Sequence, residues 1–106
     1  MKNMASRLKP VIFSPQALRD LDQIYEYIND RFGRATLLKF DKKWKSFLLL
    51  ISLHPAIFPY LNKSKNLRKH TFYNRNLVVY KNTRRHVEII TVFNTWQNPD
   101  KLKKLK

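Results

Sequence analysis

The chain has 106 residues, 43% of them hydrophobic and 13% aromatic, which suits one folded domain with a single core and is too short for two. It contains no cysteine, which excludes disulfides, thiolate-bound zinc and a nucleophilic cysteine. Lys and Arg outnumber Asp and Glu by 22 to 7, a net charge of +15 that predicts a polyanionic partner: nucleic acid, the ribosome or an acidic protein segment.

The first elements expected in chain order are a short strand in the apolar stretch of residues 8–13, which ends in Val11, Ile12 and Phe13, and a helix that follows it directly. Ser14 has the chemistry of an N-cap, and Pro15 suits the first helical position. Gly33, the only glycine, offers a left-handed C-cap for this helix without steric cost. The buried face is expected to hold the apolar residues at steps of four, three and four, with polar residues such as Asp20 on other faces: Ala17, Leu21, Ile24 and Ile28.

A second helix is predicted at residues 34–53, with Trp44 among its core residues and lysines on its solvent-exposed faces. His54-Pro55 should end it, because proline cannot continue a helix and restricts the residue before it. Residues 56–66 are expected to form a loop, and residues 99–105 a short basic helix or a frayed tail. Two helices joined at Gly33 predict a helical hairpin.

The last third of the sequence changes to a strand pattern. Residues 67–73, 76–82 and 86–93 are rich in β-branched and aromatic residues and are separated by turn signals, which predicts a three-stranded antiparallel meander. The expected fold is therefore α+β: an N-terminal strand, a two-helix hairpin and the meander, with the helices packed on one sheet face. We expect a single domain over residues 1–106, with flexible ends at 1–7 and 103–106. No segment suits a membrane span or a signal peptide, so we expect a cytoplasmic protein.

Six short motifs, in this order and over roughly residues 8–102, resemble the RelE/ParE superfamily of toxins from type II toxin–antitoxin systems. They are Ser14-Pro15-Gln16-Ala17; Asp20-Leu21 with Ile24 and Tyr27-Ile28; His54-Pro55; Asn66-Leu67-Arg68-Lys69; Val78-Val79-Tyr80; and the block from Val92 to Leu102. The resemblance implies growth inhibition, a link to plasmid stabilisation, and a cognate acidic antitoxin that forms a hetero-oligomer with the toxin.

The resemblance leaves two activities open: cleavage of messenger RNA on the ribosome, as in RelE-like members, or poisoning of DNA gyrase, as in ParE-like members. Ribonucleolysis requires a proton acceptor and cationic donors for the phosphate. The candidate catalytic residues are Arg68, His70 and Arg75. Strand alternation places Arg68 and His70 on one face and Lys69 on the other, so a catalytic pair would need that shared face to be open.

The candidate residues for nucleic-acid or antitoxin binding are Lys69, Tyr80, Arg84, Arg85 and Trp96. Trp96 stands where many relatives have an arginine, and an indole cannot bind phosphate bidentately, which weakens the case for a nuclease. The alternative readings are a degenerate toxin or a non-catalytic nucleic-acid-binding adaptor on the same fold. The sequence predicts no cofactor and no metal site, because three scattered histidines lack a carboxylate cluster.

Overall fold

The structure, a computed structural model, describes residues 8–72, 75–95 and 97–106. It is an α+β fold in which a five-stranded mixed sheet has the order β1-β5-β4-β3-β2. The elements in chain order are β1 (Val11–Phe13), α1 (Pro15–Leu53), β2 (Tyr60–Asn62), β3 (Leu67–Phe72), β4 (Asn76–Asn82), β5 (Val87–Asn94) and α2 (Pro99–Leu105). No helix in the described ranges combines the length and the apolarity that crossing a membrane requires.

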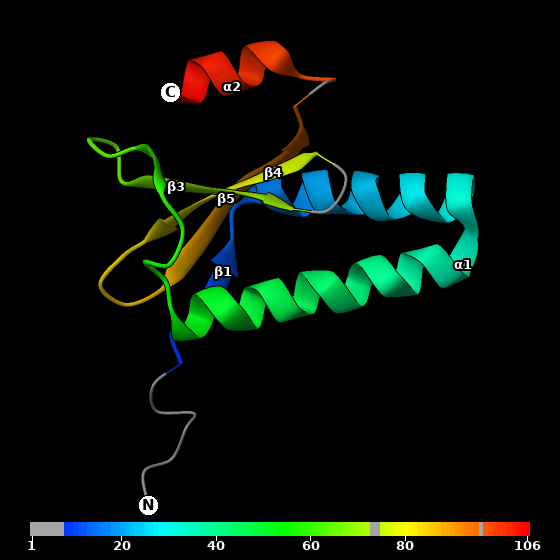
Figure 1. Cartoon of the computed structure of the whole chain (residues 1–106), viewed down its shortest axis with the longest axis horizontal. Coiled ribbons are helices and arrows are strands. Elements are labelled where there is room, and N and C mark those ends of the chain that lie inside the picture. The colour runs from blue at the N-terminus through cyan, green and yellow to red at the C-terminus, as the bar shows by residue number, and fades with distance from the viewer. Residues whose placement is uncertain (1–7, 73–74, 96) are drawn as a thin grey trace, which may run out of the picture.

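The long element α1 begins and ends as the sequence predicts. The Ser14 hydroxyl accepts a hydrogen bond from the Ala17 backbone N–H at 3.0 Å, and the helix ends at the residue before His54. The two predicted helices form one element, α1, that is interrupted at Gly33, where φ is 84° and ψ is 176°. Glycine alone adopts such a conformation easily, so the chain reverses there. Figure 1 shows the result as two antiparallel arms, called here the first arm (residues 15–32) and the second arm (residues 34–53).

The sheet contains the predicted meander as β3, β4 and β5, which pair in antiparallel fashion. Two further strands extend it. β1 pairs in parallel with β5, with Val11 opposite Val87, and β2 pairs with β3, with Tyr60 opposite Arg68. The expectation of a loop over residues 56–66 is therefore wrong for β2, a three-residue strand whose formation depends on its partner rather than on its own composition.

The two faces of the sheet are covered by different helices (Figure 1). The arms of α1 bury the larger core, and α2 packs on the opposite face through Leu102 and Leu105. The predicted packing of the hairpin on one face is confirmed for the two arms of α1. α2 covers apolar side chains of the other face that would otherwise face solvent, and it includes residues 103–105 of the end expected to be flexible. The residues under α2 are Leu67, Leu77, Val79 and Phe93. Residues 1–7, also expected to be flexible, lie outside the described residues.

Candidate functional site

The strand proposed for catalysis is β3, and its Arg68 is engaged in a structural role. Arg68 and His70 do share one face, as alternation predicts, and that face is the one toward α1, where both residues are half-buried. The Arg68 guanidinium lies 4.0 Å from the centroid of the Tyr60 ring. Its Nη1 donates hydrogen bonds to two carbonyl oxygens of the preceding loop, at 2.7 Å to Phe58 and 3.3 Å to Ala56. Arg68 therefore ties β2 and that loop to the sheet.

His70 is held in an aromatic stack. Its ring lies 4.0 Å from that of Phe58 and 5.3 Å from that of Phe47, the latter nearly parallel at 10°. Burial in this stack lowers the pKa of His70, which favours the neutral imidazole. The position and packing are those of a core-edge aromatic residue.

The two neighbours predicted to bind a ligand also have other roles. Tyr80 is fully buried, and its hydroxyl donates a hydrogen bond to the Pro55 carbonyl at 2.8 Å. Burial raises the pKa of Tyr80, so the phenol stays protonated. Lys69 is half-buried on the opposite face of β3, and its backbone N–H donates to the Pro59 carbonyl at 3.0 Å. Tyr80 is therefore a core residue, out of reach of any ligand.

The remaining predicted residues lie in turns. Arg75 is exposed between β3 and β4 with φ of 68°, and its carbonyl accepts from the Thr95 N–H at 3.2 Å. Arg84 and Arg85 are exposed at the tip of the β4–β5 turn. Trp96 lies outside the described residues. Of the three predicted catalytic residues, Arg68 and His70 lie on one face of β3, and Arg75 lies in the turn after the C-terminal end of that strand.

The described residues hold no group of three or more His, Asp or Glu side chains able to bind a metal ion. They offer instead two concave surfaces. The first is a groove of about 620 Å³ between the second arm and the C-terminal half of β3. We call it the lysine-rimmed groove. It is lined by Lys39, Lys42, Lys43, Ser46, Phe47, Leu50, His70 and Phe72.

The floor of the lysine-rimmed groove is apolar and its rim is cationic. Phe47 and Phe72 are buried below it, while Lys39, Lys42 and Lys43 are exposed above. Sequence reasoning placed these lysines on a wet helix face and missed the groove. The i, i+3, i+4 spacing of the three lysines does indicate that they share one helix face. It does not reveal the groove, because the apolar floor of the groove depends on β3, which is distant in the sequence.

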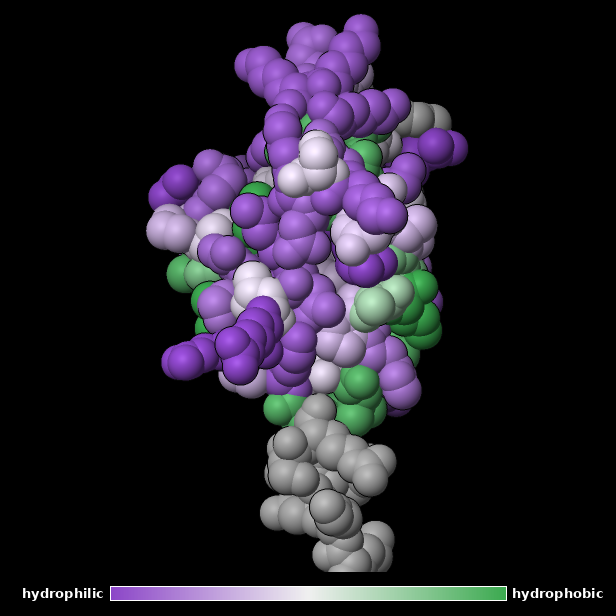
Figure 2. Space-filling model, turned by 90° about the vertical axis from the view of Figure 1, so that its left-hand side faces the viewer, coloured by the Kyte–Doolittle hydropathy of each residue, from purple (hydrophilic) through white to green (hydrophobic). Residues whose placement is uncertain are grey.

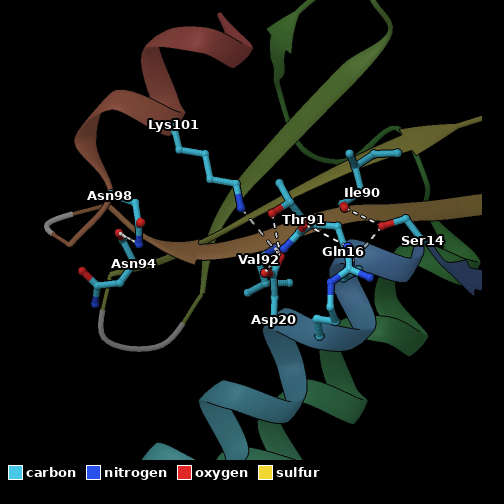
Figure 3. A network of polar contacts seen from close by, with 11 residues as sticks. Ser14, Gln16, Asp20, Ile90, Thr91, Val92, Asn94, Asn98 and Lys101 are labelled. Atoms are coloured by element: carbon cyan, nitrogen blue, oxygen red, sulfur yellow. Dashed lines mark hydrogen bonds and ion pairs between the residues drawn. The ribbon is translucent and has the colours of Figure 1, made fainter.

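The second concave surface is a cleft of about 920 Å³ between the first arm and the end of β5. Asp20 is among the lining residues of this cleft and is 8% exposed. Figure 3 shows the polar contacts around it. The Asp20 carboxylate accepts hydrogen bonds from the Thr91 hydroxyl at 2.7 Å, the Val92 N–H at 3.0 Å and the Gln16 amide at 2.7 Å. Lys101 of α2 lies 3.9 Å from it. The assignment of Asp20 to a polar face is therefore wrong.

A signal for Asp20 was present in the sequence, because it lies three residues after Ala17 and four before Ile24, within the apolar stripe. β1 pairs with β5 only as far as Ile89, and the Asp20 carboxylate accepts the hydrogen bond of the Val92 N–H, farther along the same strand. Ser14 acts in the same way one step earlier, since its hydroxyl donates to the Ile90 carbonyl at 2.6 Å. This network holds the first arm and α2 to the sheet.

Comparison with known proteins gives a consistent picture. Residues 11–99 match the family model described as the ParE toxin of type II toxin-antitoxin system, parDE. Among solved structures, the chain is similar to a chain of the chromosomal ParDE TA system from P. aeruginosa, with a TM-score of 0.67 and 13% sequence identity. That match covers 83% of this chain and 97% of the other, and at this identity it shows the fold. No curated protein matches the sequence.

Proposed function

This chain belongs to the ParE toxin family of type II toxin–antitoxin systems, and we propose that it halts growth by binding a protein target rather than by cutting nucleic acid. The target we propose is DNA gyrase, which the resemblance to ParE-like members implies. The same proposal includes a cognate acidic antitoxin that neutralises the chain by forming a complex with it.

One observation supports binding over catalysis: the residues best suited to ribonucleolysis are used in packing. The Arg68 guanidinium is bound to loop carbonyls and to the Tyr60 ring. The His70 ring packs against the rings of Phe47 and Phe58, which also contact each other, and burial lowers the pKa of His70. A phosphate-binding cation needs free donors, whereas Nη1 of Arg68 donates to two loop carbonyls. His70 lines the lysine-rimmed groove, but its ring is used in packing against Phe47 and Phe58, and its lowered pKa makes it a weaker base.

The lysine-rimmed groove supports the antitoxin part of the proposal. An amphipathic acidic segment would place apolar side chains on Leu50 and Phe72 and carboxylates beside Lys39 and Lys42. The pairing of β2 with β3 ends at Arg68, so the rest of β3 lies at the edge of the sheet beside the groove. An extended part of the antitoxin could add to that edge by main-chain hydrogen bonds.

The experiment that tests the activity uses one preparation of the antitoxin-free chain in two assays: supercoiling by purified DNA gyrase, and cleavage of messenger RNA on purified ribosomes. We expect inhibition of supercoiling and no cleavage products. The control is His70→Phe, which keeps the aromatic stack and should inhibit gyrase like the wild type. Messenger RNA cleavage by the wild type that is lost in His70→Phe would contradict the proposal and place a nuclease site on β3.

A second experiment tests the groove with two matched charge reversals on the second arm. Lys42→Glu changes the rim of the groove, and Arg34→Glu makes the same change in net charge near the Gly33 end. We expect Lys42→Glu to speed dissociation of the antitoxin and Arg34→Glu to leave it unchanged. Equal effects of the two variants would show that net charge alone governs the affinity and would remove the groove from the proposal.

A further inference from the structure

A second cationic surface lies at the other end of β3, where two turns come together. The β2–β3 turn exposes Lys63 and Lys65, and the β4–β5 turn exposes Arg84 and Arg85. Within the part of the chain that the structure describes, none of these four side chains forms an ion pair. The sequence contains no Asp or Glu between Asp41 and Glu88. We call these four residues the cationic turns.

The first of the cationic turns is held rigid by its own hydrogen bonds. The Asn62 carboxamide oxygen accepts from the Ser64 hydroxyl at 2.8 Å and from the Lys65 N–H at 3.1 Å. The Asn66 N–H donates to the Lys63 carbonyl at 3.0 Å, and Asn66 has the positive φ of 57° that closes such a turn. Lys63 and Lys65 therefore extend from a fixed backbone.

The second turn is equally constrained, and the two are joined. The Thr83 N–H and hydroxyl both donate to the His86 carbonyl, at 2.9 and 2.8 Å, which closes the turn around Arg84 and Arg85. The Asn66 side-chain amide donates to the Asn82 carbonyl at 3.1 Å, linking one turn to the other. A backbone that is already ordered loses less conformational entropy on binding, so these charges are pre-organised for a ligand.

The basic end of α2 extends this surface. Leu105 packs against the same cluster as Leu61, and the cluster contains Leu67; these two leucines flank the first turn. Figure 1 shows the C-terminal end of α2, which carries the exposed Lys103 and Lys104, at the same end of the molecule as this turn. Figure 2 views this side and shows it to be mainly hydrophilic, with hydrophobic residues toward its margins. The surface is therefore wider than the two turns alone.

The composition of this surface distinguishes a nucleic acid from a protein as its ligand. Protein interfaces are anchored by buried aromatic or aliphatic side chains, and lysine is depleted in them. None of the exposed large hydrophobic residues of the described chain lies in either turn or in α2. Contacts to a phosphate backbone need Lys and Arg and no apolar anchor. The lysine-rimmed groove, with its apolar floor, has the opposite composition.

We propose that the cationic turns, with the basic end of α2, bind the sugar-phosphate backbone of nucleic acid without reading its sequence. DNA and RNA share this phosphate chemistry. The inference goes beyond the proposed function, because it assigns the chain a ligand of its own besides its protein target and its antitoxin. It holds whichever target the chain inhibits.

The test is fluorescence anisotropy with the full chain and labelled 20-base-pair duplexes of mixed sequence, one of DNA and one of RNA, over a series of KCl concentrations. One phosphate contact for each of the four residues of the cationic turns predicts a contribution of about −3.6 to the log–log salt slope on B-DNA, and contacts from Lys103 and Lys104 add to it. The variant R84Q/R85Q should reduce the magnitude of that slope by about 2, and K63Q/K65Q should do so independently. K39Q/K42Q, with the same loss of net charge in the groove, should leave the slope nearly unchanged.

Each outcome of this test decides the proposal. Loss of affinity in both turn variants but not in the groove variant supports it, and the tighter of the two duplexes identifies the natural source of the phosphates. Equal losses in all three variants would show a diffuse charge effect and overturn it, as would unchanged binding in both turn variants. A poly-glutamate probe of equal charge that binds more tightly than either duplex would assign the surface to an acidic protein instead.

Discussion

Replacing Asp20 tests whether its hydrogen bonds to β5 hold the first arm of α1 against the sheet. In Asp20→Ala the Val92 N–H loses its acceptor in a buried position, and so does the Thr91 hydroxyl. The Gln16 amide loses its partner on the same helix, and Lys101 loses its only described ion pair. The substitution therefore leaves backbone and side-chain hydrogen-bond donors without a partner at positions that water cannot easily reach.

The size of the effect follows from these contacts. A hydrogen bond to a charged group contributes about 1.5–3 kcal/mol, and a buried donor left without a partner costs about 1–3 kcal/mol. The Lys101 pair, a third exposed and at 3.9 Å, adds less than about 1 kcal/mol. We expect Asp20→Ala to lower the free energy of unfolding by about 3–5 kcal/mol, out of the roughly 5–15 kcal/mol of a typical domain.

The assay is urea unfolding followed by far-ultraviolet circular dichroism at neutral pH. Asp20→Asn keeps a carbonyl oxygen of the same size and should lose only about 1–2 kcal/mol. Asp22→Ala, on the exposed face of the same helix, should stay within about 0.5 kcal/mol of the wild type. If Asp20→Ala and Asp22→Ala were equally stable, the buried network would contribute nothing and the reasoning would fail.

Three further variants test other parts of the structure. Gly33→Ala should cost about 1–3 kcal/mol of stability in the same urea assay, from the backbone conformation alone, because no atom lies within 4 Å of an added Cβ. His70→Phe should retain toxicity. Burial lowers the pKa of His70 in the folded state, so the wild type should lose stability as the pH falls through the unfolded-state pKa of 6.5. The variant, which has no imidazole to protonate, should lose less stability over the same pH range. Tyr25→Phe removes a 2.6 Å hydrogen bond to Asp41 that joins the two arms and should cost about 1 kcal/mol near neutral pH. Hydrogen bonds from Lys45 and Tyr25 lower the pKa of Asp41, so this difference should shrink as the pH falls below its unfolded value of 3.8; a constant difference would argue against the pair.

The parts of the fold that depend on local chemistry could be predicted from the sequence. The N-cap at Ser14, the reversal at Gly33 and the three strands of the meander each rest on residues close in the chain, and they are confirmed. β2 could not be predicted because its three residues become a strand only by pairing with β3 and packing Tyr60 against Arg68. The covering of the second sheet face by α2 likewise depends on leucines that meet the sheet only in three dimensions.

The candidate site shows where alternation stops being informative. The two-residue period establishes that Arg68 and His70 share a face, but not whether that face is open, because this depends on which side the arms of α1 cover. For Asp20, the apolar stripe around it was a usable signal, and hydrophilicity alone was the wrong guide: a carboxylate can be buried when a strand edge supplies donors.

The placement of the two proposed surfaces on β3 has a consequence for regulation. The lysine-rimmed groove lies along the C-terminal half of the strand at His70 and Phe72, and the cationic turns flank its beginning at Leu67. An antitoxin segment seated in the groove would therefore cover apolar floor and three lysines without covering either turn. The acidic partner would reduce the net charge of the complex, which weakens long-range attraction to nucleic acid, while the local contacts of Arg84 and Arg85 would stay available. Under these two proposals, an antitoxin bound in the groove would neutralise the toxin without displacing nucleic acid from the turns.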